Sequence, residues 1–298
     1  MQSRIGFIGL GIMGEPMAGH ILQKGYDLTV YNRTASKAAS LVESGARAAA
    51  SPAEVASQTD IIITIVSDTP DVEAVVAGSS GIIQGIRPGS VVVDMSTIAP
   101  AMEKHLDAQL QAVGCTLVDA PVSGGDIGAQ KGTLAIMAGG RKTDFERVKP
   151  VFEAMGSTLT HCGPVGHGQL TKLSNQILVS LTLLGVCEAV LFAEKNGLNP
   201  EVMIEAVRGG AAGSWQLSNL GPSIARADYA PGFMVDLLQK DLGLVLDAGY
   251  QARVSLLGTS LVRQLMSAAQ SMGSGTEGTQ VLARVLKTLA PHTTPNQG

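Results

Sequence analysis

Short runs of β-branched residues alternate with amphipathic stretches in the first half of the chain. Stretches such as IIITIV (61–66) and VVVD (91–94) are apolar without alternation, which is typical of strands buried on both faces. Between the runs lie helix signals such as SPAE (51–54), in which Ser51 can cap a helix and Glu54 can complete a capping box. This order predicts a parallel sheet with helices on both faces. The predicted strands are Ile5–Gly9, Leu28–Asn32, Ile61–Val66, Val91–Asp94 and Thr116–Asp119.

The pattern changes from Gly168 onward, where long leucine- and alanine-rich segments replace the β-branched runs. Breaks at NGLNP (196–200), GGAAGS (209–214) and YAPGF (229–233) predict an all-helical second domain. The Gly/Pro-rich passage HCGPVGHG (161–168) marks the boundary, so we expect domains at 1–164 and 165–298. The longest apolar run, Ile177 to Ala193, contains polar residues and falls short of the ~20 apolar residues of a bilayer span, so we expect a protein-buried helix and no membrane partner.

Composition narrows the class of protein. The 298 residues are 15% charged and 45% hydrophobic and include 36 glycines, as in a globular chain with many tight turns. The net charge of −4 and the lack of a Lys/Arg-rich block argue against a nucleic-acid partner. Cys115, Cys162 and Cys187 form no C-x-x-C, so we expect reduced core residues, with neither disulfides nor a metal site. Glycines interrupt the apolar N-terminus, unlike a signal peptide, which favours a cytoplasmic protein.

The segment GLGIMG (9–14) directly follows the first predicted strand and opens a helix. In its G-x-G-x-x-G spacing, the first glycine allows a tight turn, the second lets backbone approach a pyrophosphate, and the third permits close packing of helix on strand. The alternative is a merely structural glycine turn, which the repeated βα pattern that follows disfavours. We therefore predict a dinucleotide-binding loop that comprises Gly9, Leu10, Gly11, Ile12, Met13 and Gly14.

The second strand ends in VYNRT (30–34), where an NAD-specific domain usually has an Asp or Glu that binds the ribose hydroxyls. Asn32 does not repel a 2′-phosphate, and Arg33 can pair with one. Asn32, Arg33 and Thr34 are therefore candidate cofactor residues that favour NADP(H), with NAD(H) as the alternative. For Arg33 itself the alternative is a solvated surface side chain.

Polar residues also follow later strands at the carboxyl edge of the sheet, where ligands of open α/β sheets bind. The segment DAPVSGG (119–125) can present the Ser123 hydroxyl and the backbone N–H groups of Gly124 and Gly125 to a carboxylate, or form an ordinary glycine turn. Four residues at the ends of two other strands can likewise touch cofactor or substrate: Val66, Ser67, Ser96 and Thr97.

The segment TKLSNQ (171–176) places a lysine near the head of the apolar helix. Lys172, Asn175 and Gln176 lie at i, i+3 and i+4, so an ammonium and two amides share one helix face. A structural lysine would extend its head into water, whereas this polar group at a domain boundary indicates a ligand cleft, and hydride transfer to a carbonyl needs a proton donor. We predict that Lys172 is this donor. His161 and His167 are rival proton carriers without an evident carboxylate partner, and we interpret them as turn or surface residues.

Four motifs in order, FIGLGIMGEPMAGHIL, DAPVSGG, GHGQLTKLSNQ and PGFMVDLLQKDL, resemble those of the β-hydroxyacid dehydrogenase family over nearly the whole chain. The resemblance implies an N-terminal Rossmann domain, a long interdomain helix, an all-α C-terminal domain and a homodimer or homotetramer. It also implies that Lys172 is the catalytic proton donor and that Ser123, Gly124 and Gly125 hold the substrate carboxylate. Its other implied site residues are Asn175 and Gln176 at the substrate, and Thr97 and Lys240 at the cofactor.

The implied activity is that of an NAD(P)H-dependent oxidoreductase acting on a small carboxylate semialdehyde or hydroxy acid. Gln176 replaces the second Asn of the family's K-x-x-N-N. Together with RGGAAGS (208–214) and PGFMVDLLQKDL (231–242), it resembles members that reduce tartronate semialdehyde to D-glycerate, and we expect this reaction. The alternatives are 3-hydroxyisobutyrate dehydrogenation, glyoxylate or succinic semialdehyde reduction, which VYNRT resembles more, and a non-catalytic NADP-sensing module. His20 is a second departure, since the family's N-terminal signature usually has Asn there.

Overall fold

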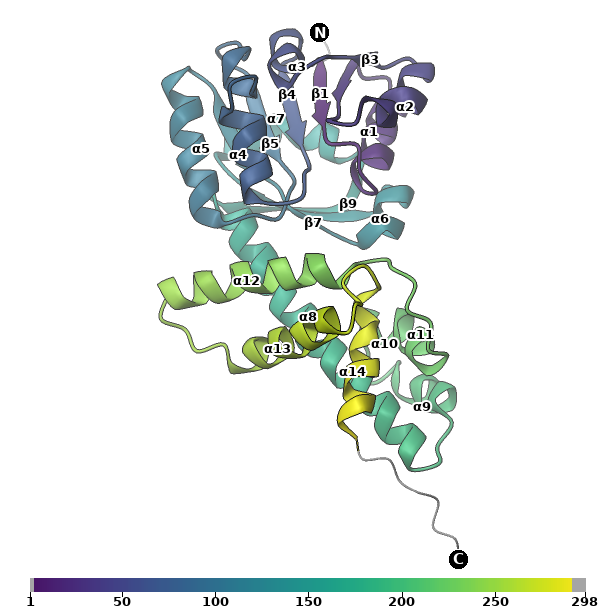
Figure 1. Ribbon diagram of the computed structural model, residues 1–298. Helices are drawn as coiled ribbons and strands as arrows, with labels where there is room; N and C mark the ends of the chain where they lie inside the picture. Colours follow the sequence, from purple (N-terminus) through teal and green to yellow (C-terminus); the bar gives the residue numbers. More distant parts are fainter. Residues whose placement is uncertain (1–2, 291–298) are drawn as a thin grey trace, which may run out of the picture. The chain divides into compact units, whose positions relative to one another are not determined.

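The computed structural model describes residues 3–290, and the chain divides into two compact units, residues 1–172 and 173–298. The division lies a little beyond the boundary expected at 164–165, because the helix α8 (His167–Lys195) begins in the first unit and ends in the second. Figure 1 shows this helix in teal, leaving the sheet-containing unit. The assignment of cofactor binding to residues 1–164, and of substrate binding and oligomerisation to residues 165–298, stays a prediction.

The first unit is built around one nine-stranded sheet within the described residues. Its order is β3-β2-β1-β4-β5-β6-β8-β7, with β9 paired to β8, and the first six strands of this order are parallel. The order reverses direction at β1, which creates the switch point where doubly wound sheets bind ligands. The strands are β1 (Ile5–Ile8), β2 (Leu28–Tyr31), β3 (Arg47–Ala48), β4 (Ile61–Thr64), β5 (Val91–Asp94), β6 (Thr116–Asp119), β7 (Val122–Ser123), β8 (Leu134–Gly139) and β9 (Gly156–Gly163).

Helices cover both faces of this sheet (Figure 1). Alternate residues of the same strand enter different cores: Ile61 and Ile63 pack with α1, α2, α6 and α7, whereas Ile62 packs with α3, α4 and α5. Burial on both faces explains why these strands read as continuous apolar runs. The helices are α1 (Gly14–Gln23), α2 (Ala39–Glu43), α3 (Pro52–Gln58), α4 (Thr69–Ala77), α5 (Pro100–Ala112), α6 (Gly125–Lys131) and α7 (Lys142–Phe152), with 3₁₀ turns at Ala35–Ala38 and Ile82–Gln84.

All five predicted strands are present, each beginning at the predicted residue. The sequence analysis missed β3 and β7, which have two residues each, and β8 and β9. The predicted cap of α3 is confirmed, because Ser51 Oγ accepts a hydrogen bond from Glu54 N at 3.1 Å. The Glu54 carboxylate completes the box one residue early, by accepting from Ala50 N at 2.6 Å.

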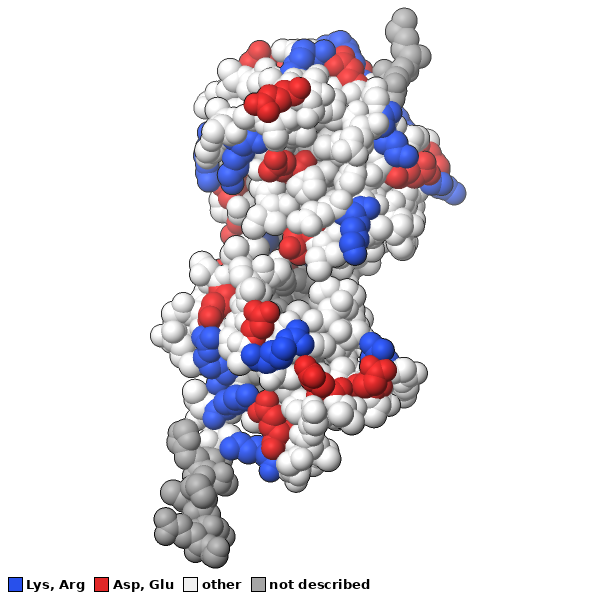
Figure 2. All heavy atoms as spheres, turned by 90° about the vertical axis from the view of Figure 1, so that its right-hand side faces the viewer, with Lys and Arg blue, Asp and Glu red and all other residues white. Residues whose placement is uncertain are grey.

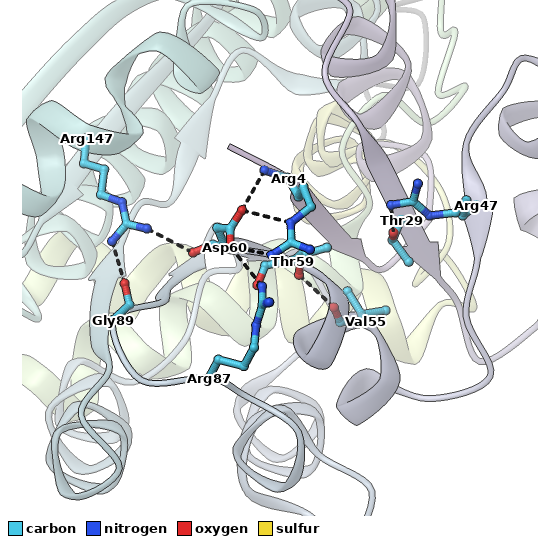
Figure 3. A network of polar contacts seen from close by, with 9 residues as sticks. All are labelled: Arg4, Thr29, Arg47, Val55, Thr59, Asp60, Arg87, Gly89 and Arg147. Carbon is cyan, nitrogen blue, oxygen red and sulfur yellow. Dashed lines mark hydrogen bonds and ion pairs between the residues drawn. The ribbon is translucent and has the colours of Figure 1, made fainter. Parts of the chain in front are cut away.

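A polar network fastens the amino edge of the sheet (Figure 3). Arg4, at the start of β1, donates two side-chain hydrogen bonds to the Asp60 carboxylate, at 3.2 and 3.0 Å. Arg87 Nη2 reaches Asp60 Oδ1 at 2.9 Å, and Arg147 Nη1 donates to Gly89 O at 2.6 Å. The Arg4 hydrogen bond is the main reason why the pKa of Asp60 is lowered. This edge lies opposite the carboxyl ends where the candidate site residues are found.

The second unit contains helices and no named strand within residues 173–290. Besides α8, its helices are α9 (Pro200–Val207), α10 (Trp215–Asn219), α11 (Gly221–Ala225), α12 (Val235–Gln251), α13 (Leu257–Ser271) and α14 (Leu282–Leu289), with a 3₁₀ turn at Thr279–Val281. Its core includes Leu183, Cys187 and Val190 of α8. By length and composition alone α8 could cross a bilayer. One side of it packs in this core, whereas Leu178 and Phe192 are exposed. Segment 291–298 lies outside the described residues.

The surface chemistry is mixed. On the face shown in Figure 2, Lys and Arg are interspersed with Asp and Glu over both units. The three cysteines are free; Cys115 and Cys187 are buried, whereas Cys162 is only partly buried, so the expectation of three core cysteines was wrong for Cys162. Cys162 lies on β9, where every residue except Gly156 is exposed or partly exposed.

Candidate functional site

The glycine loop between β1 and α1 has the geometry that a pyrophosphate needs. Gly9 has φ +101°, and a Cβ there would collide with the carbonyl oxygen of Ile65. A Cβ on Gly14 would collide with the carbonyl oxygen of Gly9, whereas a Cβ on Gly11 would meet nothing within 4 Å. The outer glycines are therefore required by packing, and Gly11 borders open space at the start of a helix whose first turn has no side-chain cap. These features fit a dinucleotide, because backbone N–H groups at a helix N-terminus attract phosphate.

Asn32 supports this loop from the end of β2. Its Oδ1 accepts a hydrogen bond from Leu10 N at 2.9 Å, and its Nδ2 donates to Thr34 O at 2.9 Å. The side chain thus holds the loop in place through its own amide. The neighbouring Arg33 side chain is 89% exposed and meets Asp71 Oδ1 at 3.5 Å. An exposed ion pair of this length contributes little, so Arg33 can exchange Asp71 for another anion.

The loops after β4 and β5 are tied to each other. Ser96 Oγ accepts a hydrogen bond from Val66 N at 2.9 Å and donates to Asp94 Oδ1 at 2.7 Å. Thr64 Oγ1 donates to the same oxygen at 2.6 Å. These bonds fix the backbone beside two predicted cofactor residues, Ser67 and Thr97, which follow immediately in the chain.

The SGG segment lies between β7 and α6. Gly124 has φ +135° and Gly125 φ +64°, conformations that side-chain-bearing residues rarely adopt. A Cβ on Gly125 would meet nothing within 4 Å, so the backbone there is open to a ligand. His20 of α1 secures α6, because its Nε2 lies 3.0 Å from both Ala129 O and Gln130 O. Both partners are carbonyls, so this nitrogen must carry the hydrogen, and the departure at position 20 has a defined structural role.

A buried carboxyl cluster under the carboxyl edge was not foreseen as a unit. Asp94, Glu103 and Asp119 each have 0% exposure. Asp119 Oδ1 accepts from Gly166 N at 2.7 Å and Oδ2 from Gln169 N at 2.8 Å, so this carboxyl caps the start of α8. Burial raises the pKa of Asp119 to about 6, although these backbone hydrogen bonds oppose the shift. The sequence signal was present only in part, since Asp94 and Asp119 end predicted strands while nothing singled out Glu103.

Lys172 follows this capped start of α8 and has 8% exposure, an unusual burial for a lysine. It is the last residue of the first unit, and Asn175 and Gln176 lie one turn later in the second unit on the same helix. The rival His161 is engaged elsewhere: its Nε2 lies 2.8 Å from Gly140 O, and its ring centroid lies 5.3 Å from that of Phe145. His161 therefore serves packing at the edge of β9.

Within the second unit a polar chain links α8 to α12. Asn175 Nδ2 donates to Gln176 Oε1 at 2.7 Å, and Gln176 Nε2 donates to Asp241 Oδ2 at 2.6 Å. Lys240 Nζ lies 3.1 Å from Asp241 Oδ1. Gln176 and Asp241 have 2% and 3% exposure, so the departure at position 176 is part of a buried polar contact.

The doubly wound sheet with a glycine loop after β1 defines a Rossmann dinucleotide-binding protein joined to a helical unit. Residues 4–163 match the family model described as the NAD binding domain of 6-phosphogluconate dehydrogenase. Residues 166–286 match that described as NAD-binding of NADP-dependent 3-hydroxyisobutyrate dehydrogenase. The chain belongs to the β-hydroxyacid dehydrogenase family and is an NAD(P)-dependent oxidoreductase, which confirms the predicted family, fold class and enzyme class.

Individual relatives span nearly the whole chain. A probable 3-hydroxyisobutyrate dehydrogenase-like 1, mitochondrial, from Arabidopsis thaliana is 41% identical over 97% of this chain and 86% of its own. The 2-hydroxy-3-oxopropionate reductase of Escherichia coli is 39% identical over 97% of this chain and 99% of its own. The crystal structure of 3-hydroxyisobutyrate dehydrogenase from Salmonella typhimurium superposes with a TM-score of 0.85 at 31% identity, covering 95% of this chain and 99% of that one.

Proposed function

We propose that this protein is an NADPH-dependent reductase of a small 3-oxo acid, and that its substrate is tartronate semialdehyde, reduced to D-glycerate. The observation that carries the proposal is Lys172, a buried cation just after the capped start of α8, next to the carboxyl edge at which α/β sheets bind ligands. Tartronate semialdehyde is 2-hydroxy-3-oxopropionate, the substrate in the name of the Escherichia coli relative. The departure at Gln176 supports the same substrate.

The proposed mechanism assigns one task to each group of residues. When bound, the nicotinamide cofactor would supply the hydride that the carbonyl carbon accepts. The Lys172 ammonium donates a proton to the carbonyl oxygen as negative charge develops there, and the resulting neutral amine regains a proton from solvent. Ser123 and the backbone of Gly124 and Gly125 bind the substrate carboxylate, because the open backbone at Gly125 offers N–H donors to an anion.

Different residues are likewise assigned to different parts of the cofactor. The glycine loop receives the pyrophosphate, supported by the Asn32 amide, and Arg33 pairs with the 2′-phosphate. Roles for Thr97 and Lys240 at the cofactor, and for Asn175 and Gln176 at the substrate, stay predictions of the family resemblance. Roles for Val66 and Ser67 stay predictions from their place at the end of a strand. A cytoplasmic location also stays a prediction.

The main alternative substrate is 3-hydroxyisobutyrate. Relatives at 41% and 31% identity carry 3-hydroxyisobutyrate dehydrogenase in their names, so oxidation of this acid is the main alternative. Glyoxylate and succinic semialdehyde are further alternatives. A non-catalytic NADP-sensing role is disfavoured by Lys172, since a sensor needs no proton donor.

We propose that the protein acts as a homodimer or homotetramer. Large apolar side chains are exposed on the second unit, including Leu178 and Phe192 of α8 at 68% each and Leu257 of α13 at 82%. Large apolar patches on a protein surface often mark contacts with another chain, and the family resemblance implies such an assembly. Light scattering coupled to size exclusion gives the mass in solution, and a monomer at micromolar concentration would contradict this assignment.

The deciding experiment is a panel assay. Oxidation of NADPH and of NADH is followed with tartronate, succinic and methylmalonate semialdehydes and with glyoxylate, and 3-hydroxyisobutyrate is tested in the oxidative direction. The highest kcat/KM is expected for tartronate semialdehyde with NADPH. A higher value for another acid would replace the proposed substrate, and no turnover of any of them would support the sensing role.

A further inference from the structure

One side chain at the head of α8 joins three parts of the first unit. Gln169 Nε2 donates to Ser96 O at 2.9 Å and to Glu103 Oε1 at 2.7 Å, while its Oε1 accepts from Ile98 N at 3.2 Å. Its own backbone N donates to Asp119. Gln169 has 0% exposure, so none of these bonds competes with water. The first turn of α8 is thus bound to the loop after β5, to α5 and to the end of β6.

The partner of this amide, Glu103, is itself paired with Asp94. Both carboxyl groups are fully buried, and Asp94 Oδ2 and Glu103 Oε2 find no other hydrogen-bond partner among the described residues. A hydrogen bond between the two carboxyls is one of the causes that shift the pKa of each. Ionised carboxylates only accept hydrogen bonds, so this contact requires a proton on one of them. Burial raises the pKa of Asp94 too, but Asp94 Oδ1 accepts hydrogen bonds from the Thr64 and Ser96 hydroxyls, which oppose this shift and favour its ionised form. Glu103 is therefore the protonated partner, and burial, together with Asp94 and Asp119, raises its pKa well above the usual value.

The same network reaches the predicted ligand loops. Ser96 Oγ, bonded to Asp94, also accepts from Val66 N at 2.9 Å. Asp119, which caps α8, precedes the segment with Ser123 by a few residues in the chain. The loops proposed to hold cofactor and substrate carboxylate are consequently connected, through buried bonds of one unit, to the helical turn that carries Lys172.

We propose that Gln169 is a positioning residue for Lys172, and that the hydrogen-bonded Glu103–Asp94 pair holds Gln169 in place. This inference rests on the proposed role of Lys172. Lys172 lies three residues after Gln169 on α8, so both project from the same side of the helix. A side chain with three buried bonds fixes the rotation and depth of this turn, and with it the origin of the lysine. Proton transfer depends steeply on such placement, since a displacement of about 1 Å can cost ~10²-fold in rate.

Three substitutions separate this role from mere stability. Gln169→Leu and Glu103→Leu keep the volume and remove the bonds, and each is expected to lower kcat about 10- to 100-fold while changing KM for NADPH less than about threefold. Glu103→Gln is the conservative variant, because its amide can donate to Asp94 and its oxygen can accept from Gln169. It should restore kcat to within about threefold of the native enzyme, which a role for Glu103 as a charged group would not allow.

Thr59→Val is the matched control. Thr59 has 0% exposure and donates Oγ1 to Val55 O at 2.7 Å, at the amino edge of the sheet (Figure 3). It should lower the melting temperature without a change in kcat. Native kcat in Gln169→Leu would overturn the inference. So would a loss of kcat in Thr59→Val as large as that in Gln169→Leu, or the same loss of kcat in Glu103→Gln as in Glu103→Leu. If Gln169→Leu does not fold, the two Glu103 variants decide.

Failure of the inference is distinguishable from failure of the proposed function. An inactive Lys172→Ala beside a fully active Gln169→Leu would overturn the positioning role alone. A fully active Lys172→Ala would overturn the proton-donor assignment, and the positioning role with it. Binding of NADPH, followed by its fluorescence, shows in each variant that the cofactor loop is intact.

Discussion

Gln176 Nε2 donates to Asp241 Oδ2 at 2.6 Å in the interior of the helical unit. The contact joins α8 to α12, and Lys240 occupies the other oxygen of the same carboxylate at 3.1 Å. An asparagine, which the family usually has at position 176, is one methylene shorter. The longer amide is therefore matched to the distance between these two helices.

Substitution of Gln176 by Leu should destabilise the protein. Asp241 would lose a buried, charge-assisted hydrogen bond, with an expected fall in the free energy of unfolding of about 1.5–3 kcal/mol. Urea denaturation measures this change, and KM for NADPH reports whether Lys240 is displaced as well. Gln251→Leu, at the exposed end of α12, is the matched control and should be nearly neutral. A Gln176→Leu protein as stable as the control would show that the contact contributes nothing.

Lys172→Ala should lower kcat by about 10²–10⁴-fold, because it removes the proposed proton donor. Lys172→Arg should also fail, since a guanidinium does not release its proton near neutral pH. NADPH binding, measured by fluorescence titration, should be nearly intact in both variants. Turnover at the native rate in either one would contradict the assignment.

His20→Ala should weaken substrate binding more than chemistry. Loss of the imidazole leaves the Ala129 and Gln130 carbonyls without their donor and loosens α6, which follows the SGG segment. One lost hydrogen bond of about 0.5–1.5 kcal/mol corresponds to a rise in KM for the acid of roughly 2- to 10-fold. Steady-state kinetics with a carboxylate substrate and with a plain aldehyde make the comparison. Equal effects on both would mean that the segment does not bind the carboxylate.

The stability of the native protein should carry a component that falls as pH rises. The folded-state pKa of Asp119 is about 6, and that of Glu103 is raised well above its ordinary value by burial and by Asp94 and Asp119. In the unfolded chain both ionise near pH 4, so above that pH the unfolded state binds fewer protons than the folded state, and unfolding becomes more favourable. Asp119 contributes between its ordinary pKa and about pH 6, and Glu103 contributes from its ordinary pKa upward.

Glu103→Gln tests this component, because its amide cannot ionise. Gln169 of α8, Asp94 of β5 and Asp119 of β6 face the group in both proteins. Chemical denaturation at several pH values should show the variant gaining stability relative to the native protein as pH increases. A constant difference across the range would mean that Glu103 titrates normally in the folded state.

The sequence predicted those parts of the fold that follow from local patterns. Strands such as Val91–Asp94 were recognisable because burial on both faces leaves a continuous apolar run, and GLGIMG because close packing requires glycine at Gly9 and Gly14. β9 was missed because most of its side chains are at least partly exposed. The hydrogen bonds of Gln169 could not be predicted from the sequence. Its partners Ser96 and Glu103 lie about seventy residues earlier, and only the folded sheet brings them next to it.

The cofactor preference can be tested at the end of β2, where the two residues have separable roles. Asn32→Asp retains the oxygen that accepts from Leu10 N and adds a charge that repels a 2′-phosphate. Arg33→Leu removes the proposed phosphate partner, and at 89% exposure its loss should not affect folding. A charge-assisted bond of roughly 1.5–3 kcal/mol corresponds to a ten- to hundredfold preference for NADPH, which the double variant should lose or invert.

The measurement is kcat/KM for NADPH and NADH at saturating semialdehyde. Asp71→Asn serves as the control, because it releases Arg33 from its exposed ion pair and should keep or increase the NADPH preference. Both Arg33 and Asp71 lie at the surface. Any change in cofactor preference therefore reports how the Asp71 carboxylate and the 2′-phosphate compete for the Arg33 guanidinium. A native preference for NADH, or an NADPH preference that survives the double substitution, would show that Arg33 remains with Asp71 when cofactor binds.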